Sequence, residues 1–469
     1  MGSFFGTAHG LFLLVGAVFL GVFIAIVPPG FGLDEQTHFY RMYQISQGRL
    51  FPEFDAEQQK FPAEIPRPVY DLLQKGWFEG NTVDRETPFY HRKDVVDAAG
   101  YAELEARSID PNDLVETDIT QTLPNFPIVY FASSSGLAIA RALGADVGGM
   151  VLASKICAAL MYLGLAFLAV WYARRLRFRW LVLTVALLPA AIFQASVISA
   201  DTFANGMALL FLSIAITLML ERQPVGRGTL VLLAAAAAGV VLSKPTYALL
   251  VGLVAVLPSG IFGSRSRGRA YQAGVLVGAL LLIGLTLYIA NKGTLAINSQ
   301  RPDVAASISA VGQIKDLLSH PAHLIVVVGT TVVVYSESWV QGVVGLFGYN
   351  TIEVPAPFVF LTVVALALAA FHTERLRRWP AWAVLIAGVA VSLAIIMTFY
   401  LTFNEIGAES AQGIQGRYFI PCVLAVVLGA ASIVPARLVM KQTTARALFT
   451  SVATVTLAVA AATYAIALF

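Results

Sequence analysis

The sequence predicts an all-α integral membrane protein, and three observations predict it. The 469-residue chain is 58% hydrophobic and only 13% charged, which is about half the charged fraction of a soluble domain. Apolar runs near the ~20 residues that cross a bilayer recur from residue 9 to the C-terminus. Charge is also divided, because the segment between Gly30 and Pro124 holds 18 acidic and 9 basic residues, leaving 10 acidic and 22 basic residues elsewhere. Soluble packing cannot bury so many wholly apolar segments.

The apolar runs predict about 11–13 transmembrane helices. Residues 9–27 are expected to be a retained first span, because Met1–Gly10 has no Lys or Arg and Pro28-Pro29 ends the run. The other candidate spans are residues 125–143, 148–173, 180–198, 203–220, 229–243, 246–262, 271–290, 322–336, 357–371, 380–402, 418–435 and 447–468. Successive spans should take the chain alternately out of and into the cell, and two places do not fit. If the N-terminus and Arg174–Arg179 are inside, segments 125–143 and 148–173 cannot both be full crossings. The short segment 322–336 joins two polar stretches that are both predicted outside. One or both places are expected to hold a half-buried or re-entrant helix.

Short basic loops set the orientation. Four of them carry clustered arginines, namely Arg174–Arg179, Arg265–Arg269, Arg375–Arg378 and Arg437–Arg446. The positive-inside rule places these loops in the cytoplasm. Loop 30–124, Asp201, Lys244 and the stretches 291–319 and 404–417 are then expected outside. Loop 30–124 is too long for a connector, and its prolines predict short, interrupted helices.

A pair of acids follows the first predicted span. Asp34 and Glu35 precede apolar residues at helical spacing within Phe39–Ile45, with Gly48 as C-cap, which predicts a short amphipathic helix on the membrane surface. The dipole at its N-terminus favours an ionised carboxylate by roughly 0.3–1 kcal/mol, which keeps a base available at head-group depth. The alternative is that both acids serve only as cap and dipole partners.

Three further polar positions are predicted on the same side. Lys244 lies between two apolar runs and precedes Pro245, so it either snorkels or presents an ammonium to a phosphate. Arg417 follows two glycines and either anchors the interface or offers a planar fork to phosphate. Asp201, at the outer end of a span pair, either caps the helix that starts near Thr202 or takes part in a site.

These residues carry a resemblance to a group of enzymes. Asp34-Glu35 after the first span, then His38, Arg41 and the stretch Gly48–Pro52, resembles the first-loop signature of polyprenyl-phosphate-dependent glycosyltransferases of the GT-C fold. That group includes protein mannosyltransferases and the aminoarabinose transferase of lipid A.

A closer likeness is to a bacterial membrane family labelled as a domain of unknown function. It shares the Asp-Glu-x-x-His opening, the stretch Ser199–Asp201, Lys244-Pro245 and the ending Gln415–Tyr418, so the matches extend from residue 28 to 421. One departure is notable. The related enzymes often carry His-Pro-Pro before the second span, where this chain has Thr122–Pro127.

The resemblance implies one GT-C-like membrane domain over residues 1–469, with loop 30–124 as its first extracytoplasmic loop carrying juxtamembrane helices. It implies an inverting hexosyl- or pentosyltransferase that moves a sugar from a polyprenyl-phosphate donor to a glycan, lipid or protein acceptor. Asp34 is then the expected general base, with Glu35 supporting it or exchanging roles, while Lys244 and Arg417 stabilise the phosphate leaving group. Additional site candidates are His38, Arg41, Asp201, Gln415 and Tyr418.

The implied location is the bacterial cytoplasmic (inner) membrane, with the site on the periplasmic or extracellular side. The expected partners are the donor lipid, the glycan or lipid acceptor, membrane lipids, a donor-lipid synthase and a flippase, and no nucleic acid. No cofactor is required by the sequence. A divalent metal stays open, because some GT-C enzymes use one and Asp34, Glu35 and Asp201 could share a cation if the fold brings them together.

A transporter or flippase of a lipid-linked glycan is the alternative function. It would predict ionisable residues deep in several spans and repeated halves, whereas the runs 148–173 and 447–468 hold only Lys155 between them. A structural partner of a synthase would leave the acid pair without a role. Cys157 and Cys422 lie in apolar runs as small buried residues, and no Cys/His spacing predicts a zinc site.

Overall fold

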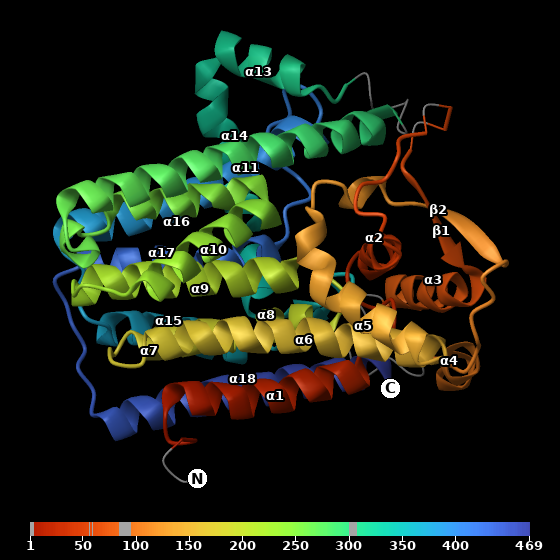
Figure 1. Ribbon diagram of the computed structural model, residues 1–469, viewed down its shortest axis with the longest axis horizontal. Helices are drawn as coiled ribbons and strands as arrows, with labels where there is room; N and C mark the ends of the chain where they lie inside the picture. Colours follow the sequence, from red (N-terminus) through yellow and green to blue (C-terminus); the bar gives the residue numbers. More distant parts are fainter. Residues whose placement is uncertain (1–3, 56, 59, 84–94, 300–306) are drawn as a thin grey trace.

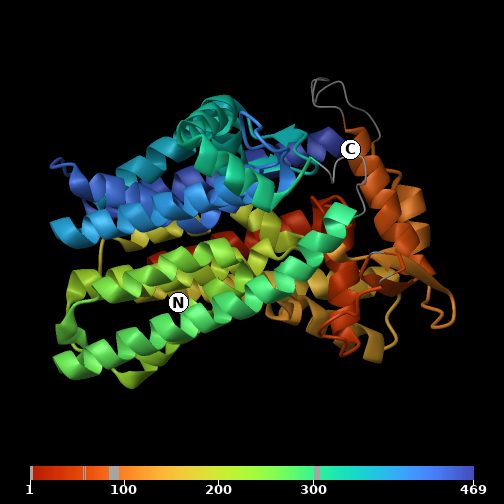
Figure 2. The same cartoon turned by 90° about the horizontal axis from the view of Figure 1, so that it is seen from above.

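The long helices run side by side as a bundle, and the short elements of the first loop gather at one end of it (Figure 1). Figure 2, turned by 90°, shows the same arrangement. The computed structural model describes residues 4–55, 57–58, 60–83, 95–299 and 307–469. Residues 84–94 of the predicted loop 30–124 and residues 300–306 of the predicted outer stretch lie outside the described residues.

Among the described residues, eight helices are long and apolar enough to cross a membrane. They are α1 (Ala8–Ile26), α6 (Val147–Tyr172), α9 (Asp201–Glu221), α11 (Arg265–Ser299), α14 (Pro321–Val344), α16 (Arg378–Phe403), η6 with α17 (Gly416–Phe419 and Ile420–Ile433) and α18 (Gln442–Leu468). The chain is thus an all-α integral membrane protein, as predicted.

Further apolar helices complete the bundle. The pair α7 (Arg179–Ala186) and α8 (Pro189–Ser196) is bent by 51°, because Pro189 cannot continue the preceding helix. Three shorter apolar helices are α10 (Arg227–Ser243), the 3₁₀ helix η4 (Pro245–Val256) and α15 (Ala356–His372). The predicted 11–13 spans are reached only when the bent pair and these shorter helices are counted with the eight.

The predicted span 125–143 is not a crossing helix. It forms the 3₁₀ turn η3 (Pro127–Tyr130) and the 12-residue helix α5 (Phe131–Ala142). Twelve residues of α-helix extend only about 18 Å, well short of the hydrocarbon core of a bilayer. Helix α5 packs on α6, and of these two helices only α6 is long and apolar enough to cross.

The predicted segment 322–336 belongs to the longer helix α14, whose two ends adjoin segments predicted on the same side. Before α14, helix α13 (Ala310–Ser319) reaches the C-terminal end of α16, where Gln313 Nε2 donates to the Tyr400 carbonyl over 3.2 Å. After α14, the hairpin of β3 (Leu346–Phe347) and β4 (Ile352–Glu353) carries Tyr349, whose hydroxyl donates to the Gly30 carbonyl over 3.0 Å. These contacts favour the re-entrant or half-buried alternative for α14, although its length and composition would allow a crossing.

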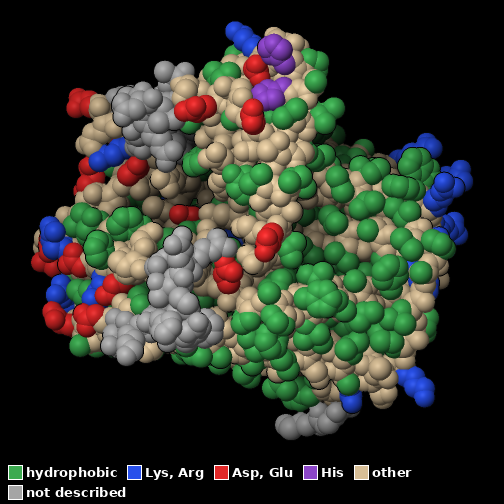
Figure 3. Space-filling view, turned by 180° about the vertical axis from the view of Figure 1, so that it is seen from behind, with side chains coloured by type: hydrophobic (Ala, Val, Ile, Leu, Met, Phe, Trp, Pro, Cys, Tyr) green, Lys and Arg blue, Asp and Glu red, His purple; other side chains and the backbone are tan. Residues whose placement is uncertain are grey.

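The basic loops meet at the opposite end of the bundle. The Arg177 amide donates to Glu374 Oε1 over 2.8 Å, and the Met440 amide donates to His372 Nδ1 over 3.2 Å, which joins three of the four loops. Figure 3 shows Lys and Arg without acidic side chains at one end, acidic side chains mixed with Lys and Arg at the other, and a broad hydrophobic surface between the two ends. We call the end with the four arginine loops the basic end and the end with residues 30–124 the site end. This division of charge fits the predicted orientation.

The first loop folds into short elements that cover the site end. They are α2 (Glu35–Ser46), β1 (Pro62–Pro66), α3 (Arg67–Thr82), α4 (Ala98–Glu105), β2 (Leu114–Asp118) and the 3₁₀ turn η2 (Thr120–Thr122). Strands β1 and β2 pair antiparallel, with Ala63 opposite Thr117. Helix α2 was predicted to lie on the membrane surface, and this is wrong: nine of its twelve residues are buried. The cause is tertiary, because α3, α5 and β1 all pack on it.

Candidate functional site

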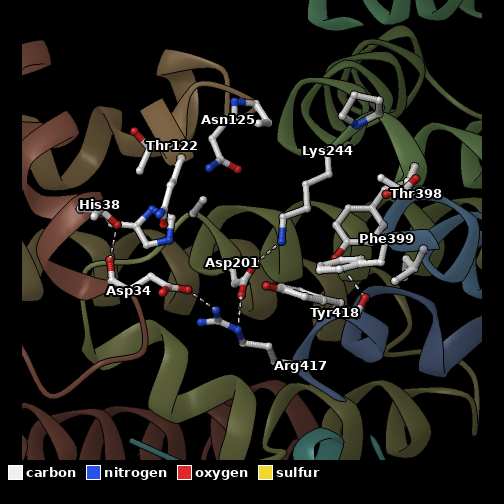
Figure 4. A pocket seen from close by; sticks show the side chains of 18 residues that line it. Asp34, His38, Thr122, Asn125, Asp201, Lys244, Thr398, Phe399, Arg417 and Tyr418 are labelled. Carbon is white, nitrogen blue, oxygen red and sulfur yellow. Dashed lines mark hydrogen bonds and ion pairs between the residues drawn. The ribbon is translucent and has the colours of Figure 1, made fainter. Parts of the chain in front are cut away.

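A cavity of about 290 Å³ opens at the site end. Its walls come from α2, residues 121–125, the first residue of α9, the turn between α10 and η4, α16 and η6. Four charged side chains face it from separate parts of the sequence, namely Asp34, Asp201, Lys244 and Arg417 (Figure 4). The fold therefore brings together the predicted base and both predicted phosphate ligands.

Asp34 is directed at the cavity by an uncommon backbone conformation. Its φ of 60° and ψ of 14° lie in the left-handed region, which is costly for a residue other than glycine and is often found at functional sites. It immediately precedes α2, yet its side chain makes no capping hydrogen bond. The side chain is 45% exposed. The alternative that Asp34 serves only as a helix cap is therefore not supported.

Arg417 lies between the two cavity acids. Its Nη2 is 3.1 Å from Asp34 Oδ2, and its Nε is 3.4 Å from Asp201 Oδ2. Its Nη1 also donates to the Leu33 carbonyl over 3.4 Å. The side chain is 7% exposed, so this planar guanidinium is a fixed element that ties α9, η6 and the turn before α2 together.

Lys244 reaches the same acid from the opposite wall. Helix α10 ends at this residue and Pro245 starts η4, so the break that the proline predicts turns the lysine toward the cavity. Its Nζ lies 2.7 Å from Asp201 Oδ1 and 4.2 Å from the centroid of the Tyr418 ring, within the range of a cation–π contact. The Tyr418 ring stacks on Phe399 with centroids 5.6 Å apart. Lys244 is 24% exposed and is the more accessible of the two cavity cations.

His38 lines the cavity, and its imidazole is neutral near pH 7. Burial lowers the pKa of His38 to about 4, although Asp34 opposes that shift. Burial also raises the pKa of Tyr130 above its ordinary value, so the phenol stays protonated. The Tyr130 hydroxyl lies 2.6 Å from His38 Nδ1, within hydrogen-bonding distance.

Glu35, predicted as the partner of Asp34, faces away from this cavity. Its Oε2 accepts from the amides of Gly30 and Gly32, each over 3.0 Å, and its Oε1 accepts from the amide of Ile198 over 3.0 Å. Lys155 Nζ lies 3.8 Å from Oε1. Lys155 was not predicted to be a partner of Glu35. A single lysine inside an otherwise apolar span was the signal in the sequence that a buried acid lies near it.

Two other predicted candidates are not brought to the cavity. Arg41 is buried and donates to the carbonyl oxygens of Arg49 and Leu50, where it holds the chain that follows α2. Gln415 precedes η6, and its Oε1 is buried without a partner among the described residues. Tyr418, by contrast, lines the cavity.

Residues 121–125 contribute a wall that was not predicted as part of the site. Thr122 and Asn125 line the cavity, in the stretch where the glycosyltransferases that the sequence resembles often carry His-Pro-Pro. The departure from that motif was the available signal. The hydroxyl of Thr122 and the amide of Asn125 are neutral hydrogen-bonding groups and cannot carry the charge of an imidazolium.

The three acids that could share a cation are divided by the fold. Asp34 and Asp201 both adjoin Arg417, whereas Glu35 is occupied by backbone amides. In the part of the chain that the structure describes, no group of three or more His, Cys, Asp or Glu residues has an arrangement suited to a metal ion.

No curated protein and no solved structure matches the chain. A family model described as a predicted membrane protein, DUF2142, matches residues 17–426. The match includes Asp34, Asp201, Lys244 and Arg417, the charged residues that the cavity brings together. It covers most of the 469 residues, so the chain belongs to the DUF2142 family of membrane proteins.

Proposed function

We propose that this protein is a membrane glycosyltransferase that moves a sugar from a polyprenyl-phosphate donor to a hydroxyl of a glycan, lipid or protein acceptor. One observation carries the proposal: a half-exposed carboxylate, Asp34, shares a cavity with Lys244 and Arg417 at one end of a membrane-spanning bundle. A proton acceptor beside two cations is the equipment that displacement of a phosphate by a hydroxyl needs.

The reaction is a single displacement. Asp34 accepts the proton of the acceptor hydroxyl while the oxygen of that hydroxyl forms a bond to the anomeric carbon of the donor sugar. The bond between that carbon and the phosphate oxygen breaks, and the lipid phosphate leaves with the electron pair. Lys244 and Arg417 stabilise the charge that develops on the phosphate. Attack from the face opposite the leaving group inverts the anomeric centre.

The charges around the cavity suggest a different role for each of the two cations. Asp34 and Asp201 balance Lys244 and Arg417, so an incoming phosphate must compete for a contact that already exists. Lys244 is partly exposed and has only Asp201 as an ion-pair partner among the described residues, so it is the cation that turns to the donor. Arg417 is nearly buried and contacts both acids, so it holds Asp34 in place and adds positive potential.

The remaining wall fits a donor attached to a lipid. Ile395, Thr398 and Phe399 of α16 line the cavity beside Lys244. On the same helix Val389 and Leu393 are exposed, at 42% and 41%, in a surface that the membrane would cover. A prenyl chain could follow this apolar surface while its phosphate meets Lys244. The positive-inside orientation would place the site on the extracytoplasmic face of a bacterial cytoplasmic membrane.

The test is a transfer assay with purified protein, a synthetic polyprenyl-phosphate sugar and a panel of glycan and lipid acceptors. We expect release of polyprenyl phosphate in step with sugar appearing on one acceptor. In sealed vesicles, movement of the intact donor across the bilayer with no cleavage would contradict the proposal and favour a transporter.

A further inference from the structure

A second charged group lies beside the cavity without lining it. It consists of the Glu35 carboxylate, the amides of Gly30, Gly32 and Ile198, and the Lys155 ammonium, and we call it the Glu35 latch. The side chains of Glu35 and Lys155 are 1% and 3% exposed. Lys155 Nζ also donates to the Val27 carbonyl at the end of α1 over 3.0 Å. The latch therefore joins α1, α6, the turn before α2 and the turn between α8 and α9.

The contacts of the carboxylate leave it poorly placed for proton transfer in the cavity. Each oxygen already accepts from at least one backbone amide, and an ammonium lies close to one of them. Burying a carboxylate costs desolvation free energy, which is offset only where the carboxylate is well hydrogen-bonded. Removing the carboxylate would leave buried amides without acceptors. Glu35 would have to give up these bonds to reach a substrate.

The two turns that the latch joins carry the two acids of the cavity. Asp34 directly precedes Glu35, and Asp201 lies three residues after Ile198. The turns pack closely, because a Cβ added at Gly32 would lie 3.0 Å from Val197 Cβ and 3.1 Å from Glu35 Oε2. A shift of the latch would thus move the backbone of Asp34 relative to Asp201.

We infer that Glu35 is a positioning residue that fixes Asp34 against the turn between α8 and α9, and that Asp34 alone accepts the proton. The inference rests on the proposed function for its kinetic part, whereas its structural part stands independently. Misplacing a catalytic group by about 1 Å can cost about 10²-fold in rate. The latch thus affects the rate of sugar transfer through the position of Asp34, without contacting the substrate.

The first experiment compares Glu35→Gln with Asp34→Asn by amide hydrogen exchange. The glutamine keeps the size of the side chain but turns an NH₂ group toward amide donors. We expect faster exchange in peptides covering residues 28–36 and 195–201 for Glu35→Gln, and exchange like the wild type in 195–201 for Asp34→Asn. Unchanged exchange in Glu35→Gln would overturn the latch. This readout needs no turnover, so failure of the proposed function would not obscure it.

The second measurement is the pH profile of sugar transfer by Glu35→Gln. A positioning role predicts a turnover lowered by about 10- to 100-fold with the acid limb of the wild-type profile retained, because the carboxylate of Asp34 is still the proton acceptor. Loss of that limb would make Glu35 the base and overturn the inference. Wild-type turnover in a variant whose latch exchanges faster would overturn it as well.

A milder variant keeps the test usable if Glu35→Gln does not fold. Gly32→Ala leaves every charge in place and pushes a methyl group between Val197 and Glu35. We expect faster exchange in residues 195–201 and a smaller loss of turnover. The matched control is Gly21→Ala in α1, where a Cβ would meet no atom within 4 Å. Gly32→Ala and Gly21→Ala behaving alike in both readouts would contradict the latch.

Discussion

Arg417 and Asp34 form an ion pair across 383 residues of sequence, with Nη2 3.1 Å from Oδ2. The arginine side chain is 7% exposed and the aspartate side chain 45%. The guanidinium therefore orients the carboxylate while leaving part of it open to the cavity. A base held in this way needs little reorganisation when the acceptor hydroxyl arrives.

Lys244→Ala is expected to weaken use of the donor more than it weakens folding. It removes the accessible cation, while Asp201 keeps Arg417 as a partner. Loss of one charge-assisted hydrogen bond costs about 1.5–3 kcal/mol, so the KM for the donor should rise by roughly 10- to 150-fold. Steady-state kinetics and binding of the donor lipid in detergent would measure this.

The matched control for that variant is Lys60→Ala. Lys60 also forms an ion pair, with its Nζ 2.7 Å from Glu116 Oε1, but it lies outside the cavity. We expect its KM for the donor to equal the wild-type value. Equal effects of Lys60→Ala and Lys244→Ala, or wild-type kinetics in Lys244→Ala, would show that Lys244 does not bind phosphate.

His38 should make stability depend on pH on the acid side. Its folded-state pKa is about 4 and its ordinary value is 6.5. Below pH 6.5 the unfolded chain takes up this proton before the folded protein does, so the free energy of unfolding falls as the pH drops toward 4. The amide of His38→Asn can donate or accept a hydrogen bond, as an imidazole does, but it does not titrate. Between pH 7 and pH 5 its Tm should therefore fall less than that of the wild type.

The control for this comparison is His320→Asn, which removes a histidine whose side chain is 71% exposed. Its Tm should fall with pH as the wild type does. A His38→Asn variant whose Tm falls as steeply as the wild type would mean that burial of His38 does not carry this pH dependence.

Membrane topology should follow the division of charge. We expect cysteines placed at Asn81, Ser319 and Ala356 to react with an impermeant thiol reagent in cells with a permeabilised outer membrane. A cysteine at Ser266, in the basic end, should react only after the inner membrane is opened. Ser319 and Ala356 flank α14, so labelling on opposite sides would mean that α14 crosses the bilayer. Protection at Asn81 with labelling at Ser266 would reverse the orientation.

The sequence predicted the class of fold and the four charged residues of the cavity, because both leave local patterns in the chain. The length of an apolar run is sufficient to predict a transmembrane span. Asp34, Lys244 and Arg417 each lie beside a helix break that a nearby proline or glycine indicates. The short helix α5 and the long helix α14 were harder to predict. Helix α5 is too short to be a span because it has only 12 residues. Helix α14 has the length and composition of a span, and only its contacts favour another arrangement.

The roles of the two adjacent acids could not be separated from sequence. Asp34 and Glu35 have similar chemistry. Their different roles depend on a left-handed φ at Asp34 and on the amide of Ile198, which lies 163 residues further along the chain. Arg41 was predicted as an additional site candidate, yet its guanidinium donates to carbonyl oxygens of the chain that follows α2. Such assignments depend on tertiary partners that no local pattern reports.

The central claim is that Asp34 is the base of a sugar transfer, and the ratio of turnover between Asp34→Asn and the wild type tests it most directly. The swap keeps the size of the side chain and its contact with Arg417 but removes the proton acceptor. A positioned base contributes about 10²–10⁴-fold, so we expect turnover on a polyprenyl-phosphate sugar to fall by that factor while donor affinity stays near the wild-type value. Wild-type turnover in Asp34→Asn would contradict the account.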